Sequence, residues 1–249
     1  MNYIGIDGCR KGWFYVCLGD TDNWKTGVIQ DIQSLIDEFH EECLILVDIP
    51  VGLRRNGNLE RLCDKEARKV LGNRKSSVFP VPCRNAVYAS TYEEASHINF
   101  QLTGKYISKQ SWFISGRIRQ VDELLTNSVK RKYVREVHPE VCFWGLNGGK
   151  SMNHYKRTPE GFYERLSVIR NVYEKCDELV DDALDKYKKR DVNRDDILDA
   201  LVAAVTARCG FKALKTIPDV PEHDEMGLPM EMVYYQLQSK KKQSQVVVS

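Results

Sequence analysis

Three aspartates stand at the start of the most apolar helical stretch in the chain. The stretch is RDDILDALVAAVTARCG, residues 194–210, and its acids are Asp195, Asp196 and Asp199. Between residues 197 and 207 Asp199 is the only charged residue, a pattern typical of a helix that is buried on nearly all sides. Asp196 and Asp199 are three residues apart and therefore share a helix face. Because an unpaired buried carboxylate is unfavourable or becomes protonated, these acids need a counter-charge.

Two further aspartates end apolar runs that have the composition of buried strands. Asp7 closes YIGID, residues 3–7, and Asp48 lies in LILVDIP, residues 44–50. If both runs are central, parallel strands, the two carboxylates project at one edge of the sheet, where ligand sites of open α/β sheets lie. The alternative is local, since a lone aspartate after a strand is often a turn residue and acids in a first helical turn are favoured by the helix dipole.

A divalent cation would relieve the repulsion among carboxylates that meet in this way. Carboxylate oxygens are the ligands that Mg²⁺ and Mn²⁺ prefer. A zinc site is less favoured, because the chain has only five histidines and no CxxC pair. In two-metal sites the ions lie about 3.5–4 Å apart and stabilise the attacking and leaving oxygens of phosphoryl transfer. The three acid groups, distant in sequence, thus share one explanation, a carboxylate-rich metal site.

The hydrophobic pattern predicts the elements that must position these acids. The first strand and a run at 13–18 flank the turn GCRKG, which predicts a hairpin, and 25–30 is a weaker third strand. DIQSLIDEFHEE predicts an amphipathic helix with Asp31 as its N-cap, and the run at 44–50 a buried parallel strand. This order predicts an α/β fold with a mixed sheet. After these elements we expect an insertion of helices and loops at about 51–130, followed by β structure at 132–143 that Pro139 interrupts. Two helical stretches follow, from about 160 to 189 and from about 195 to 209. The last expected element is an edge strand within 227–237.

Length and composition suit one domain of ordinary globular character. The chain has 249 residues and a formal net charge of +2, so overall charge does not indicate a polyanionic partner. We expect a single domain over residues 1–238 and a disordered tail at 239–249. The start of the chain has no signal-peptide pattern and no apolar run has membrane-spanning length, so we expect no membrane association and a cytoplasmic location. The eight cysteines are single and are predicted to be reduced, partly buried thiols.

The predicted insertion is locally basic. Its cations between residues 54 and 84 are Arg54, Arg55, Arg61, Lys65, Arg68, Lys69, Arg74, Lys75 and Arg84, against three acids. Such an excess beside an acidic metal site favours contacts with the phosphates of nucleic acid or a nucleotide. The side chains that we single out as substrate contacts are Arg10, Lys11, Arg54, Arg74, Arg84, Lys105 and Lys109. Phe79, Tyr88 and Trp112 either stack on bases or form a core of the insertion itself.

The segment REVHPEVCF carries a further group of polar side chains. Glu136, His138 and Glu140 alternate along it, so in a strand they would face one side. One interpretation adds them to the active site, with Glu136 or Glu140 as a metal ligand and His138 as a general acid or base or a phosphate contact. The other is a salt-bridge cluster at the end of a strand, with Pro139 shaping the turn.

Three segments together resemble the ribonuclease H-like superfamily, namely YIGIDGCRKGWFYVCL, LILVDIPVGL and DDILDALVAAVTA. The last is similar to the final helix of Holliday-junction resolvases of the RuvC type, which also carry two aspartates three residues apart before an Ala-rich run. More closely, the chain resembles the predicted nucleases of the domain-of-unknown-function family 429. The segments of that resemblance lie between residues 3 and 235 and include GIDGCRKGW, DIPVGL, SSVFPVPCRNAVYA, TGKYISKQSW and EVHPEVCFWGLNGG.

The resemblance implies a ribonuclease H-like mixed sheet flanked by helices, with the insertion between core strands four and five. It also implies metal ligands at Asp7, Asp48, Asp196 and Asp199, and leaves the role of Asp195 open. The resolvases carry a glutamate on strand four, where this chain has Asp48, one methylene shorter. The metal geometry or the position of the substrate is therefore expected to differ.

The sequence thus predicts a Mg²⁺- or Mn²⁺-dependent nuclease, a hydrolase of phosphodiester bonds in which Asp7 bridges two ions and Asp48, Asp196 and Asp199 complete the coordination. DNA, RNA and a small nucleotide all remain open as substrates. One alternative is an actin-like or sugar-kinase-like phosphotransferase, which also begins with an Asp–Gly hairpin, although its second phosphate hairpin is not apparent here. GLNGGKS, residues 145–151, lacks the spacing of an ATP-binding P-loop. The other alternative is a catalytically idle binding protein that keeps the acids for stability.

Overall fold

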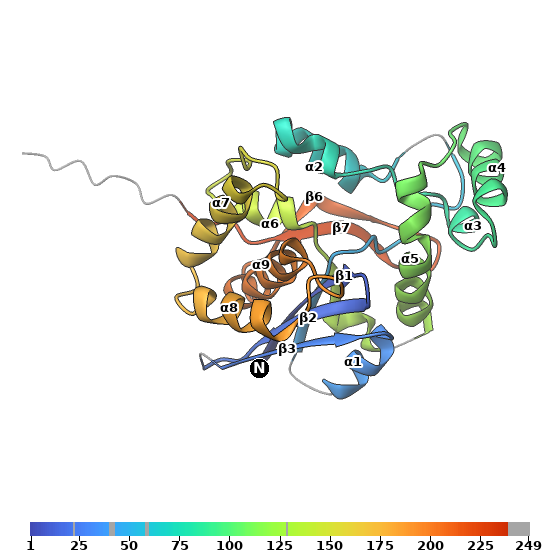
Figure 1. The fold of residues 1–249 in the computed structure, drawn as a ribbon. Coiled ribbons are helices and arrows are strands. Elements are labelled where there is room, and N and C mark those ends of the chain that lie inside the picture. Colours follow the sequence, from blue (N-terminus) through green and yellow to red (C-terminus); the bar gives the residue numbers. More distant parts are fainter. Residues whose placement is uncertain (22, 40–42, 58–59, 128, 239–249) are drawn as a thin grey trace, which may run out of the picture.

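The computed structural model describes residues 1–21, 23–39, 43–57, 60–127 and 129–238 (Figure 1). The predicted tail at 239–249 and the end of the predicted helix at 40–42 lie outside the described residues. Throughout the described part of the chain, no helix combines the length and the apolar character that crossing a lipid bilayer requires. All eight cysteines are free thiols, and seven of them are buried, as predicted.

A mixed five-stranded sheet forms the centre of the molecule. Its strands are β1 (Asn2–Cys9), β2 (Gly12–Leu18), β3 (Trp24–Ile29), β4 (Cys43–Val47) and β5 (Val134–Glu136), in the order β3-β2-β1-β4-β5. The first three strands are antiparallel to one another, and β4 and β5 run parallel to β1. The predicted hairpin, third strand and buried parallel strand are confirmed. The parallel pairing places the carboxyl ends of β1, β4 and β5 at the same edge.

Helices cover both faces of this sheet (Figure 1). On one face Tyr3, Phe14 and Leu46 share a core with helices α6 (Pro139–Leu146), α7 (Pro159–Arg170), α8 (Cys176–Lys186) and α9 (Arg194–Gly210). On the other face Ile4 and Ile6 share a core with helices α1 (Ile32–Glu38) and α5 (Lys109–Asn127). The strands are therefore apolar on both sides, which fits the near-continuous apolar runs in their sequences.

Helix α9 approaches β1 unusually closely. A Cβ atom on Gly5 would lie 2.0 Å from the backbone oxygen of Ala200 and 2.3 Å from the backbone nitrogen of Ala204. The contact is possible because Gly5 has no side chain and the facing helix residues are alanines. This packing fixes the position of the α9 acids relative to the end of β1.

The segment between β4 and β5 is the predicted insertion of helices and loops. Its elements are α2 (Leu62–Leu71), the 3₁₀ helix η1 (Gly72–Ser77), α3 (Arg84–Val87), α4 (Tyr92–Thr103), α5 and the 3₁₀ helix η2 (Val129–Tyr133). Cys83, Ala86, Ala95 and Ile107 form a small core of its own. Because Ile118 and Val121 of α5 belong to the core beneath the sheet, the insertion is also part of the second helical layer.

Three predicted elements differ from those in the structure. The β structure expected at 132–143 ends at Glu136, because Pro139 begins α6 at a position where proline is favoured. The helix expected from 160 to 189 is two helices, α7 and α8. The last strand, β7 (Pro229–Tyr234), is not an edge of the main sheet but pairs with β6 (Lys215–His223) in a separate two-stranded sheet. Prolines 218 and 221 hid β6 in the sequence.

Candidate active site

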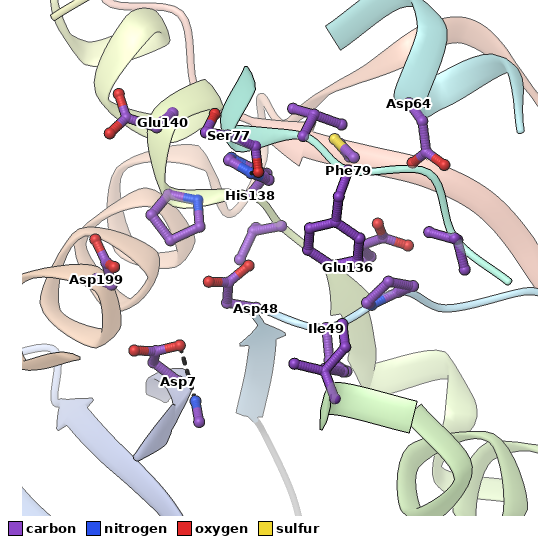
Figure 2. Close-up of a pocket in the computed structure, with 18 of the residues that line it drawn as sticks. Asp7, Asp48, Ile49, Asp64, Ser77, Phe79, Glu136, His138, Glu140 and Asp199 are labelled. Carbon is purple, nitrogen blue, oxygen red and sulfur yellow. Dashed lines mark hydrogen bonds between the residues drawn. The ribbon is translucent and has the colours of Figure 1, made fainter. Parts of the chain in front are cut away.

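Three aspartates converge at the carboxyl edge of the sheet. Figure 2 shows Asp7, Asp48 and Asp199 pointing toward one another from the ends of β1 and β4 and from α9. Side chains along a strand alternate between the two faces of the sheet. Asp7 therefore lies on the same face as Tyr3 and Gly5, and Asp48 lies on the same face as Leu44 and Leu46. This is the face that α9 covers, and the alternation explains why the acids converge. The three carboxyl groups line a cavity of about 490 Å³.

Burial and mutual repulsion disfavour negative charge on these carboxyl groups. Burial, followed by the charges of Asp48 and Asp199, raises the pKa of Asp7 well above its usual range. Burial also raises the pKa of Asp48 to about 6 and the pKa of Asp199 above its usual range. Without an added cation, these carboxyl groups therefore resist full ionisation.

Lys156 supplies the positive charge nearest to these acids. Its Nζ lies 2.5 Å from Oδ2 of Asp199 and 3.9 Å from Oδ2 of Asp195. Burial opposes its charge, but the neighbouring carboxylates of Asp199 and Asp7 prevail and raise the pKa of Lys156. The lysine precedes α7, whose N-cap is the Thr158 hydroxyl, and sequence reasoning missed it because a loop residue belongs to no periodic pattern.

The two other α9 acids have local partners. Asp196 closes a capping box, since its Oδ2 accepts hydrogen bonds from the backbone nitrogen of Asn193 at 2.8 Å and from its Nδ2 at 3.2 Å. Burial raises the pKa of Asp196 to about 6, and its charge is felt by Asp7. Asp195 faces Nε of Arg157 at 3.4 Å. Asp199 is among the described residues that line the cavity, and Asp196 is not. The two acids that were predicted to act together therefore differ in role, since Asp199 faces the cavity and Asp196 caps the helix.

Glu136 belongs to a different arrangement from the aspartates. Like Val134, it points away from α9, and its carboxylate accepts two hydrogen bonds from Arg61, at 2.7 and 2.8 Å, and one from the backbone nitrogen of Val51 at 2.6 Å. Arg61 also donates to both carboxylate oxygens of Asp64. Burial raises the pKa of Glu136 to about 7. These contacts favour the salt-bridge interpretation, in which Glu136 ties the insertion to the end of β5.

The expected shared face of Glu136, His138 and Glu140 is not present, because the strand ends before His138. Glu140 lies on the first turn of α6, pairs with Arg165, and has Arg74 at 3.6 Å. Its Oε2 is buried and has no hydrogen-bond partner in the described structure. Both Glu140 and His138 line the cavity (Figure 2).

His138 contributes a free ring nitrogen to the site. Its Nε2 lies 3.2 Å from the backbone oxygen of Ser77, a contact that requires Nε2 to carry the hydrogen. Its Nδ1 is buried without a hydrogen-bond partner in the described structure. His138 and Asp48 both line the cavity (Figure 2). In the neutral ring, Nδ1 is therefore an available proton acceptor next to Asp48.

The predicted basic contacts are scattered rather than gathered at one place. Arg74 lines the cavity and lies over the ring of Tyr155. Arg84 forms ion pairs with Asp122 and Asp224, and its guanidinium therefore stabilises the fold. Three more of these residues do not line this cavity. They are Arg54, which is partly buried and pairs with Glu222, Lys105, which pairs with Glu60, and Lys109, which is exposed at the start of α5.

Some of the remaining predicted contact residues line a cavity, and the others do not. Arg10 and Lys11 are exposed in the turn between β1 and β2, and Arg10 lines a second cavity beside the first. Of the three aromatic residues, Phe79 lines the first cavity. Tyr88 donates to Asp122 and Trp112 packs against Tyr92, so both belong to the insertion's own structure.

The donor chemistry of the site suits a hard divalent cation. Within the described residues no three His, Cys, Asp or Glu side chains are already arranged as a metal-binding group. Three carboxyl groups nevertheless converge with one ammonium group, so negative charge is in excess, and burial together with mutual repulsion raises their pKa values. Mg²⁺ or Mn²⁺ would satisfy Asp7, Asp48 and Asp199 with oxygen coordination.

The comparison with protein families gives one match. A family model described as "Protein of unknown function (DUF429)" matches residues 5–223, and the chain belongs to this family. The matched span contains every acid of the cavity, from Asp7 to Asp199. No curated protein and no solved structure matches the chain.

Proposed function

We propose that this protein is a Mg²⁺- or Mn²⁺-dependent nuclease of ribonuclease H-like fold. The observation that carries the proposal is the convergence of Asp7, Asp48 and Asp199 from three elements onto one cavity with an excess of negative charge. The strand meander, the parallel fourth and fifth strands and the insertion between them support the fold assignment. The three segments that resemble the ribonuclease H-like superfamily contain these same three acids.

Asp7, Asp48 and Asp199 would hold the metal, and the unpaired Oε2 of Glu140 lies in the same cavity. A divalent cation bound there would supply Lewis-acid chemistry for phosphodiester hydrolysis. Lys156 orients the Asp199 carboxylate and presents positive charge to the substrate. His138, with its Nε2–H fixed by Ser77, holds Nδ1 ready to accept a proton beside Asp48.

A panel of single-stranded, double-stranded and branched DNA and RNA, each with Mg²⁺, Mn²⁺ or EDTA, tests the proposal. Cleavage should require the metal and should be abolished in Asp7→Asn. Asp181→Asn is the matched control, because it makes the same change at an exposed position of α8 and should cleave normally. Metal-independent cleavage, or full activity of Asp7→Asn, contradicts the proposal.

The Lys156–Asp199 ion pair specifically favours a second candidate, a binding protein whose acids serve stability. In that case the ammonium group is the permanent counter-charge and no metal binds. Calorimetric titration with Mn²⁺ separates the two candidates, since a site that remains metal-free at millimolar Mn²⁺ supports the second. A rise in melting temperature with ATP–Mg²⁺, but not with oligonucleotides, would instead support the phosphotransferase alternative.

A further inference from the structure

A second cavity, also of about 490 Å³, lies directly beside the acidic one. It is bordered by the turn between β1 and β2, the loop before α7 and the connection between α8 and α9. Arg157 lines both cavities, so the two are neighbours that share a wall. The volume lies within the range of about 300–1,000 Å³ that is usual for small-ligand sites.

The rim of this second cavity is strongly basic. Four cations line it, and they are Arg10, Arg157, Lys189 and Arg194. The single lining acid is Asp195, which already faces Arg157 and Lys156. Arg10 and Lys189 are exposed, and no carboxylate of the described residues pairs with either. The cavity therefore has positive charge available for an anion.

The wall of the cavity is apolar and held in place. Leu184, Tyr187 and Val192 form it, and Leu184 is 43% exposed. The Tyr187 hydroxyl lies 3.2 Å from the Thr26 hydroxyl, and its ring meets Phe14 edge-on, so the ring orientation is fixed. An apolar wall with a basic rim matches the two halves of a nucleotide, the base and the phosphate.

We infer that this cavity binds an unpaired nucleotide of a single-stranded nucleic acid that passes through the acidic site. The inference rests on the proposed function, in which the acidic site would cleave the strand at the neighbouring phosphate. The base packs on Leu184 and Tyr187, and the flanking phosphate contacts Arg10 and Lys189. A paired base cannot enter a recess, because its face and edge are occupied by the duplex, unless the duplex first releases it at a cost of a few kcal/mol. The substrate class is therefore single-stranded nucleic acid.

The test measures binding without cleavage. The wild-type chain in EDTA is titrated against a fluorescein-labelled 20-nucleotide single strand and against the duplex of the same sequence, at several salt concentrations. The single strand should bind at least about tenfold more tightly. Arg10→Gln and Lys189→Gln should each weaken single-strand binding several-fold and reduce the salt slope by about 0.7 for each lost phosphate contact. Leu184→Ala should weaken binding without changing the slope.

Lys212→Gln is the matched control, because Lys212 is exposed just beyond the opposite end of the 17-residue helix α9. Equal affinity for single strand and duplex, or equal effects of Lys189→Gln and Lys212→Gln, would overturn the inference. Failure of the nucleotide cavity and failure of the proposed function give different results. Binding that follows the expected pattern without cleavage in Mg²⁺ refutes the nuclease alone, and cleavage that is insensitive to these substitutions refutes the nucleotide cavity alone.

Discussion

Two groups of buried acids line the same cavity and are neutralised in different ways. Arg61 places a planar guanidinium between Glu136 and Asp64 and donates to both carboxylate oxygens of each. Lys156 places one ammonium group against Asp199, while Asp7 and Asp48 face the cavity and have no ion pair with a cation in the described structure. The first group is complete as it stands, and the second lacks positive charge. The degree of neutralisation, rather than burial or cavity lining, therefore distinguishes the structural acids from the candidate catalytic ones.

The largest effect is expected from Asp7→Asn, which removes one carboxylate from the incompletely neutralised group. The rate of the proposed nuclease reaction should fall by about 10³-fold or more, because a metal contributes several kcal/mol to charge stabilisation in the transition state. The melting temperature should not fall, since the substitution removes a buried carboxyl group that is repelled by its neighbours. Steady-state cleavage assays and thermal unfolding measure the two results, and a collapse of stability would place Asp7 in the structural group instead.

Arg61→Met tests the other group. Removing the guanidinium leaves Glu136 and Asp64 buried without their partner, so the free energy of unfolding should fall by about 3–5 kcal/mol. Arg170→Met is the control, because the Arg170–Asp177 pair is 47% exposed on both sides and should contribute less than about 1 kcal/mol. Urea unfolding of the two variants makes the comparison, and similar losses would show that burial of the Arg61 network has no special cost.

The acidic site should also make stability depend on pH and on metal together. The pKa of Asp48 is about 6 in the fold and those of Asp7 and Asp199 are raised, so the folded chain binds more protons than the unfolded chain. In the absence of metal, stability should therefore decrease as pH rises from about 4 through 6. Mg²⁺ at about ten times its Kd should restore about 1.4 kcal/mol at pH 8 and have little effect at pH 5, where protons compete. Thermal unfolding with and without Mg²⁺ at both values measures this, and equal stabilisation at both would contradict it.

The smallest effect is expected from Lys156→Gln. Loss of the ammonium group should lower the stability of the metal-free protein by about 1 kcal/mol, because Asp199 loses its ion pair. The affinity for Mn²⁺ should increase several-fold, because the cation no longer competes with the lysine. Calorimetry on this variant and on Lys212→Gln separates the two effects, and weaker Mn²⁺ binding in Lys156→Gln would mean that the lysine organises the ligands rather than competing for them.

The positions of Asp7 and Asp48 were predictable from the sequence because parallel strands end at one edge and side chains alternate along them. Asp199 was predictable as the only charged residue between residues 197 and 207 of an apolar helix. The partners of these acids were not. Lys156 lies in a loop, and Arg61 is 75 residues from Glu136, so no local spacing connects either cation to the acid it meets.

Prolines account for the main errors in the predicted fold. Pro139 was interpreted as a break in a strand, whereas it begins α6 and turns Glu140 onto a helix. Pro218 and Pro221 concealed β6, and without β6 the strand at 229–234 had no visible partner other than the main sheet. In both cases the residue type was compatible with two structures, and only the tertiary partner decided between them.

The distance between the acids on α9 and those on the strands is set by a residue that has no side chain. Any Cβ at Gly5 would collide with the backbone of Ala200 and Ala204 and would push α9 outward. Asp199 lies next to Ala200, so this displacement would move its carboxylate away from Asp7. Because the obstructing atoms belong to the backbone, which cannot move as a flexible side chain can, a single added methyl group far from solvent would change the site and destabilise the fold together.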